Sequence, residues 1–126
     1  MQHLHTELKE IISIYGIENS HKEVKPRLFL HKAQDTFFYK NKEFDLVISL
    51  GCLHNLKIFE IARSLEEIQR VSKQAYVMVE SYRNEKELFN LQCWALTCET
   101  FLYPDEWKWF FKKNNYSGDF EFIYFE

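Results

Sequence analysis

Residues Lys42 to Leu56 read KEFDLVISLGCLHNL, and this stretch decides the fold that the sequence predicts. The run FDLVISL is a continuous series of apolar and β-branched residues, which is typical of a strand covered on both faces of a sheet. The run ends with Ser49 and Leu50, and Gly51, Cys52 and His54 come directly after it. Small and polar residues directly after a buried strand indicate that a ligand binds at the end of that strand.

Helical and strand patterns alternate after this stretch. KIFEIARSLEEIQRVSK has apolar residues at helical spacing, and AYVMVESY (75–82) is a second buried-type strand. Asn84 opens a further helix with a capping-box arrangement, Pro104 starts another, and Gly118 precedes a last strand, DFEFIYF. Strands that alternate with amphipathic helices predict an α/β layer with a largely parallel sheet. Ligands of such sheets lie beyond the carboxyl ends of the strands.

The region before Pro26 allows two interpretations. We favour a helix from Glu7 to about Val24, because one helical face gathers the apolar residues Leu8, Ile11, Ile12 and Tyr15. The alternative is that IYGIEN (14–19) is itself a strand. LFLHKAQD, from Leu28, is predicted to be a short strand that leads into a loop.

Length and composition exclude several classes of protein. A chain of 126 residues that is 46% hydrophobic and 17% aromatic predicts one domain, 1–126, with a compact core. The net charge of -3, with Lys and Glu interleaved, gives no surface for nucleic acid. No apolar run has the roughly 18 residues that span a bilayer, so we expect no membrane partner. Cys52, Cys93 and Cys98 have no metal-ligand spacing and predict reduced thiols in a cytoplasmic protein without a metal site.

Several motifs, in the right order and spacing, resemble the class I S-adenosylmethionine-dependent methyltransferases. FDLVISLGCLHNL resembles the fourth-strand motif of that family, and SLEEIQRV with YVMVESY resembles the helix and strand that follow it. HKAQDTFFY resembles the third-strand loop, and the tail from Tyr103 resembles the closing helix and strand of a small bacterial subgroup. The resemblance covers about residues 12 to 126. It implies a Rossmann-like fold and the transfer of a methyl group from S-adenosylmethionine to an unidentified acceptor.

The resemblance also implies where the cofactor binds. Ala33 would present its backbone near the adenine, and the turn of Ser49, Leu50 and Gly51 would lie beside the methionine portion. His54 would stand at the mouth of the pocket as the candidate catalytic base, with a structural hydrogen-bonding role as the alternative. Glu80, at the end of the next strand, would either contact the acceptor or be held in a cap or a salt bridge.

The sequence departs from the family pattern in three places. Lys32 stands where the family often has an acid that accepts the adenine amino group, and lysine has only donors. Gly16, Gly51 and Gly118 are isolated, so the first strand and its Gly-x-Gly loop have no counterpart. A clear ribose-binding acid at the end of the second strand is also missing: the nearest acid is Glu10 if the first region is the helix after that strand, and Glu18 if IYGIEN is itself the strand.

We therefore expect a family fold truncated at the N-terminus, with weak or absent methyl transfer by this chain. An absent central strand would leave open sheet edges and apolar surface that need cover. The alternative function follows from that expectation. It is a non-catalytic α/β fragment that acts by self-association, as a homo-oligomer, or through a partner subunit.

Overall fold

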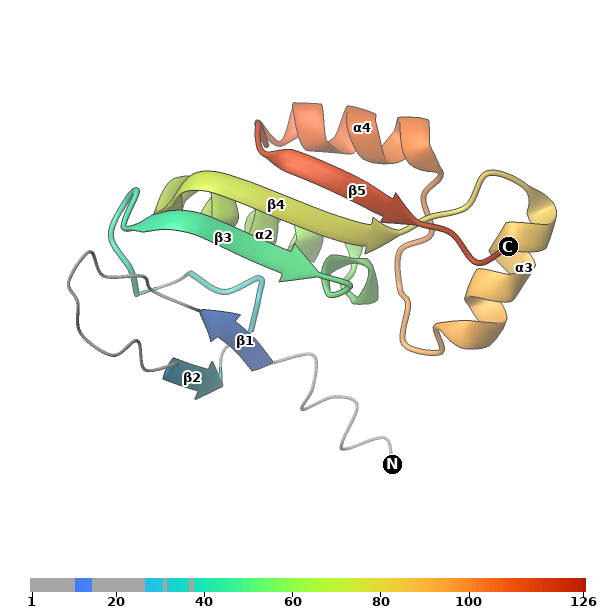
Figure 1. The fold of residues 1–126 in the computed structure, drawn as a ribbon, viewed down its shortest axis with the longest axis horizontal. Coiled ribbons are helices and arrows are strands. Elements are labelled where there is room, and N and C mark those ends of the chain that lie inside the picture. Colours follow the sequence, from blue (N-terminus) through green and yellow to red (C-terminus); the bar gives the residue numbers. More distant parts are fainter. Residues whose placement is uncertain (1–10, 15–26, 31, 37) are drawn as a thin grey trace.

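The computed structural model describes residues 11–14, 27–30, 32–36 and 38–126 (Figure 1). The elements are, in chain order, β1 (Ile11–Ile14), β2 (Arg27–Leu30), β3 (Phe44–Leu50), the 3-10 turn η1 (Leu53–Asn55), α2 (Ile58–Val71), β4 (Ser72–Glu80), α3 (Glu85–Trp94), α4 (Pro104–Lys113) and β5 (Asp119–Ile123). Strands β3, β4 and β5 form a parallel sheet in that order, and β1 pairs with β2. The parallel sheet with flanking helices confirms the predicted α/β, Rossmann-like class.

The favoured helix near the N-terminus is wrong where the structure describes it. Residues Ile11–Ile14 form a strand that pairs antiparallel with β2, with Ile11 opposite Leu30. Three of these four residues are isoleucine, whose β-branched side chain favours strands over helices. The rest of the predicted helix, with Glu10 and Glu18, lies outside the described residues.

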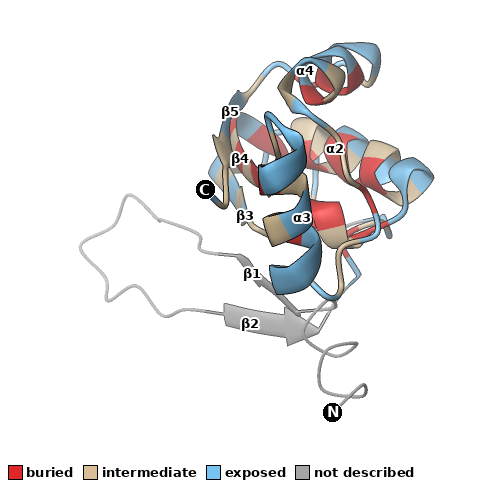
Figure 2. Ribbon diagram, turned by 90° about the vertical axis from the view of Figure 1, so that its right-hand side faces the viewer, coloured by how far each residue is buried: buried red, intermediate tan, exposed pale blue. Residues whose placement is uncertain are grey.

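Helices cover one face of the parallel sheet. In Figure 2, α2 and α4 lie on the same side of the three strands. The face toward them carries the alternate β4 residues Ala75, Val77 and Val79, all buried. Against it pack the buried apolar residues of the two helices, Ile61, Leu65, Ile68, Trp107, Phe110 and Phe111. The hydrophobic core therefore lies between the sheet and this helical layer.

The opposite face of β3 is exposed. Leu46, Ile48 and Leu50 have 48%, 51% and 59% of their surface exposed to solvent. Residues paired across parallel strands point to the same face, so Tyr76 and Met78 of β4 share this face with Ile48 and Leu50. The prediction that β3 is covered on both faces is therefore wrong for the described residues. An apolar strand sequence shows that the strand is hydrophobic, but it does not show whether a second layer of helices packs on the sheet.

Local sequence features explain where α3 and β5 begin. Asn84 caps α3, since its Oδ1 accepts a hydrogen bond from the Glu87 N–H at 2.9 Å, as its capping pattern predicts. Gly118 leads into β5 at a point where a Cβ would lie 2.6 Å from the carbonyl oxygen of Ala75. Only glycine fits so close to the neighbouring strand. No helix in the described part of the chain combines the length and apolar character that crossing a membrane requires.

Candidate functional site

The chain leaves β3 through a tight corner at Gly51. Gly51 has a φ of 60°, in the left-handed region that favours glycine. Its N–H donates to the carbonyl oxygen of Met78 at 2.9 Å, which extends the β3–β4 pairing by one residue. A Cβ at Gly51 would meet no atom within 4 Å. The corner is therefore open on that side, at the edge of the sheet where parallel folds bind ligands.

Hydrogen bonds fix the turn after the corner to the segment 97–100. The Asn55 amide donates to the Gly51 carbonyl at 3.4 Å, and the Thr97 hydroxyl donates to Oδ1 of Asn55 at 2.8 Å. The Thr100 hydroxyl donates to the carbonyl oxygen of Leu56 at 2.6 Å. The two threonine bonds join residues more than forty positions apart, so the corner is held by the fold and not by its own sequence alone.

His54 and Glu80 form a largely buried pair beside this corner. Nε2 of His54 lies 3.0 Å from Oε2 of Glu80, and their side chains are 2% and 12% exposed. Burial raises the pKa of the Glu80 carboxyl above its ordinary value, because a charged carboxylate loses its water. The carbonyl oxygen of His54 accepts from the N–H groups of Glu99 and Thr100, at 3.0 and 3.1 Å. The histidine is thus held at both its side chain and its backbone.

This geometry bears on the predictions for both Glu80 and His54. Glu80 lies within ion-pair distance of His54, as its structural alternative predicts, and contact of Glu80 with an acceptor stays a prediction. The resemblance puts His54 at the mouth of a pocket, whereas its ring is almost fully buried. A ring at this depth orients its carboxylate partner, and Glu80 is the more accessible member of the pair. Burial also raises the pKa of the Cys52 thiol, which leaves it a weak nucleophile at neutral pH.

The residues expected to bind the cofactor lie at different depths. Ser49 and Gly51 are half-buried, whereas Leu50 is 59% exposed. Ala33 is buried and belongs to the same apolar cluster as Leu53 of η1, so the loop after β2 is anchored in the core that supports the corner. The exposed Lys32 precedes it. The structure therefore brings the corner and the His54–Glu80 pair together through η1, with Ala33 anchored in the same core.

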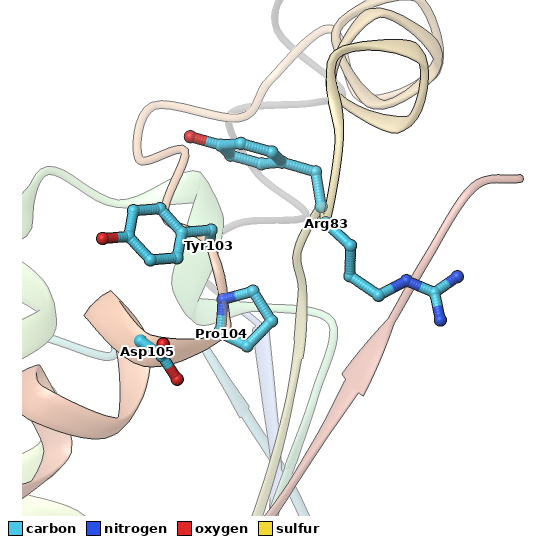
Figure 3. Close-up of a pocket in the computed structure, with 5 residues that line it drawn as sticks. Arg83, Tyr103, Pro104 and Asp105 are labelled. Atoms are coloured by element: carbon cyan, nitrogen blue, oxygen red, sulfur yellow. The ribbon is translucent and has the colours of Figure 1, made fainter.

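Sequence reasoning missed a second feature, a depression of about 330 Å³ beyond the end of β4. Its lining consists of Tyr82, Arg83, Tyr103, Pro104 and Asp105 (Figure 3). The Ser81 hydroxyl donates to the carbonyl oxygen of Leu102 at 2.8 Å and joins the two segments that form it. No group of three or more His, Cys, Asp or Glu residues in the described ranges could hold a metal ion.

No family model, curated protein or solved structure matches this chain. The methyltransferase resemblance therefore stays a prediction that rests on the sequence motifs.

Proposed function

We propose that this chain is a class I methyltransferase-type protein of the cytoplasm that binds S-adenosylmethionine at the carboxyl edge of its sheet and moves the methyl group to an unidentified acceptor. The observation that supports this most is the corner at Gly51, which follows β3 in the left-handed region and is open where a Cβ would stand. A glycine with free space at its Cβ position lets a bulky cofactor approach the backbone closely. This supports the proposal that the cofactor lies on that side of the corner.

The chain's own residues would bind the cofactor and orient the acceptor. The backbone of Ser49, Leu50 and Gly51 would flank the methionine portion, and Ala33 would lie toward the adenine. The cofactor, when bound, supplies a methyl group activated by a positive sulfonium. Methyl transfer needs chiefly positioning and the exclusion of water, so a protein base is not required. Glu80 would face the acceptor, and His54 would act as a positioning residue that holds Glu80 in place.

We expect the binding to be weak. The isolated glycines of the sequence provide no Gly-rich turn, whose backbone N–H groups and close approach hold the cofactor in the family. A titration of the 126-residue chain with S-adenosylhomocysteine, followed by calorimetry and by NMR, tests this. We expect shifts confined to the corner and a dissociation constant above the micromolar range. Micromolar affinity would contradict the expected weak binding. The absence of any NMR shift at millimolar S-adenosylhomocysteine would contradict the methyltransferase proposal.

A matched pair of variants locates the site. Leu50→Lys and Leu46→Lys place the same charge on the same exposed face of β3, one at the corner and one at the other end of the strand. The sulfonium of S-adenosylmethionine is positive, so Leu50→Lys should weaken its binding about tenfold, on the order expected for close like charges in a partly desolvated site. Leu46→Lys should leave it within about twofold. Equal losses in both variants would place the cofactor elsewhere.

A second candidate function, self-association, is favoured by the exposed face of the sheet. Leu46, Ile48 and Leu50 are each about half exposed or more, and apolar patches of this kind mark interaction surfaces. Among the described strands, β3 pairs with β4 alone, so its other edge is open as well.

Sedimentation velocity over a wide range of protein concentration tests self-association. The wild-type chain should sediment as a dimer or larger species, and Ile48→Lys should sediment as a monomer, because a lysine cannot be buried unpaired in an apolar interface. A wild-type monomer at all concentrations would exclude this function. A monomer that also binds S-adenosylhomocysteine fits only the methyltransferase proposal.

A further inference from the structure

The depression beyond β4 has two aromatic walls. The rings of Tyr82 and Tyr103 have centroids 6.5 Å apart and planes at 69°, an edge-to-face arrangement. Tyr103 is 45% exposed, so its ring is accessible from solvent. The face of an aromatic ring carries negative charge density and attracts organic cations. Two rings that meet at a steep angle form a corner into which a compact cation fits.

The cationic side chain that lines the depression does not occupy it. Arg83 bonds Glu87, lies 2.7 Å from Oε1 of Glu126, and stacks 4.0 Å from the ring centroid of Tyr124. Figure 3 shows its guanidinium pointing away from Tyr103, Pro104 and Asp105. The charge of Arg83 is therefore offset by Glu87 and Glu126, which reduces its repulsion of a cation in the depression.

Two carboxylates of α4 lie at or next to the depression. Asp105 lines it, and Glu106 follows in the first turn of α4. The pKa of Tyr82 is raised by burial first and by the negative charge of Glu106 second. The charge of Glu106 therefore acts on the Tyr82 hydroxyl, although Glu106 does not itself line the depression.

An anion is the competing ligand, because the depression adjoins a helix N-terminus. That terminus carries about half a positive charge, whereas Asp105 and Glu106 together carry two negative charges. The donors at this end are few, because Pro104 at the first helical position has no N–H and the N–H of Tyr103 donates to Oε1 of Glu106 at 3.0 Å. The balance of charge favours a cation.

We propose that the depression lined by Tyr82, Tyr103 and Asp105 binds a small organic ammonium ion. Binding of an ammonium ion does not require methyl transfer. If S-adenosylmethionine also binds at the Gly51 corner, the ammonium site identifies the methyl acceptor or the product as an amine. This identification of the acceptor rests on the proposed function. The volume of about 330 Å³ is enough for a trimethylammonium group. Aromatic walls with a nearby carboxylate recognise such groups by their charge and shape.

Choline and its uncharged isostere 3,3-dimethylbutan-1-ol test the proposal without any cofactor. Each is titrated into isotopically labelled protein and followed by NMR. We expect choline to shift the signals of Tyr82 and Tyr103 with millimolar affinity that falls as salt is added, and the neutral isostere to bind at least fivefold more weakly. Because S-adenosylmethionine is absent from these titrations, their result does not depend on the methyltransferase proposal.

Three variants assign the contacts. Tyr103→Leu should reduce choline affinity at least fivefold, and Tyr103→Phe, which keeps the ring, should restore it. Asp105→Asn should weaken binding about threefold, whereas Asp119→Asn, at an exposed acid on β5, should leave it unchanged. Equal binding of choline and its isostere, or no loss in Tyr103→Leu, would overturn the proposal. Preferential binding of inorganic phosphate would overturn it in favour of the helix N-terminus.

Discussion

Nε2 of His54 lies 3.0 Å from Oε2 of Glu80, so the turn after β3 and the end of β4 are joined by a pair of ionisable side chains. The two residues are 26 positions apart in the sequence and meet because parallel strands bring their carboxyl ends to one edge of the sheet. This edge is also where Gly51 opens the corner of β3. The pair is therefore both part of the candidate site and part of the packing that shapes it.

The raised pKa of Glu80 predicts a pH dependence of stability. Its ordinary value is 4.5, and burial raises it in the folded protein. Between the unfolded and the folded pKa, the folded state binds more protons than the unfolded state. The free energy of unfolding attributable to this group is thus highest below the unfolded pKa and falls as the pH rises through the folded one.

Urea unfolding from pH 4 to pH 8 measures this effect. Glu80→Gln should remove the falling limb, so that the stability of the variant relative to the wild type rises with pH. Glu99→Gln, at an exposed carboxyl near the same segment, should leave the limb in place. A difference between Glu80→Gln and the wild type that does not change with pH would contradict the assignment.

The two glycines beside the sheet should respond differently to alanine. Gly118→Ala would place a Cβ 2.6 Å from the Ala75 carbonyl oxygen, so a backbone shift is needed and we expect a loss of about 3 kcal/mol. At Gly51 an added Cβ has free space, so Gly51→Ala should lower the free energy of unfolding only through the strain of the left-handed backbone, by about 1 kcal/mol. Chemical denaturation of both variants measures the difference. Equal losses would show that space around the Cβ does not decide the cost.

The two faces of the sheet predict opposite sensitivities to truncation. Val77 is fully buried, so Val77→Ala should cost about 2 kcal/mol through lost apolar burial and a small cavity. Ile48→Ala removes more atoms but should cost about 1 kcal/mol or less, because half of that side chain is already in water. Unfolding at low protein concentration, where self-association is weak, gives both values. A larger loss for Ile48→Ala would mean that its face is covered.

The sequence predicted what local patterns determine. FDLVISL and YVMVE indicated parallel strands, and Asn84 and Pro104 marked helix starts that the structure confirms. The strand Ile11–Ile14 was missed because a few isoleucines fit a helical face as well as a strand, and only its pairing with β2 decides. The exposed face of β3 was missed for a related reason, since a strand's composition does not reveal how many layers cover it.

The sequence predicted only those parts of the candidate site that depend on local pattern. The end of β3 was identified from its small and polar residues, and the salt bridge of Glu80 was one of two open interpretations. The depth of His54 was not predictable, because it depends on the backbone bonds from Glu99 and Thr100, which lie on a distant segment. The depression at Tyr82 and Tyr103 likewise forms only when residues after β4 meet residues before α4.

Two buried serines offer a test of which hydrogen bonds hold the depression together. Ser81 and Ser64 are both fully buried, and each hydroxyl donates to a carbonyl oxygen, of Leu102 at 2.8 Å and of Glu60 at 2.9 Å. The Ser64 bond is redundant, because the carbonyl of Glu60 already accepts the helical N–H four residues on. The Ser81 bond joins two segments, and its loss leaves the Leu102 carbonyl without this donor.

Ser81→Ala should therefore cost about 1–2 kcal/mol of unfolding free energy, whereas Ser64→Ala should be near neutral because alanine favours the helix. Ser81→Ala should also weaken choline binding, since the segments carrying Tyr82 and Tyr103 are no longer held together. Ser64→Ala, within α2, should leave choline binding unchanged. Denaturation and the choline titration, run on both variants, check the two effects separately. Equal stability losses would show that the Ser81 bond is not the one that joins the end of β4 to the start of α4.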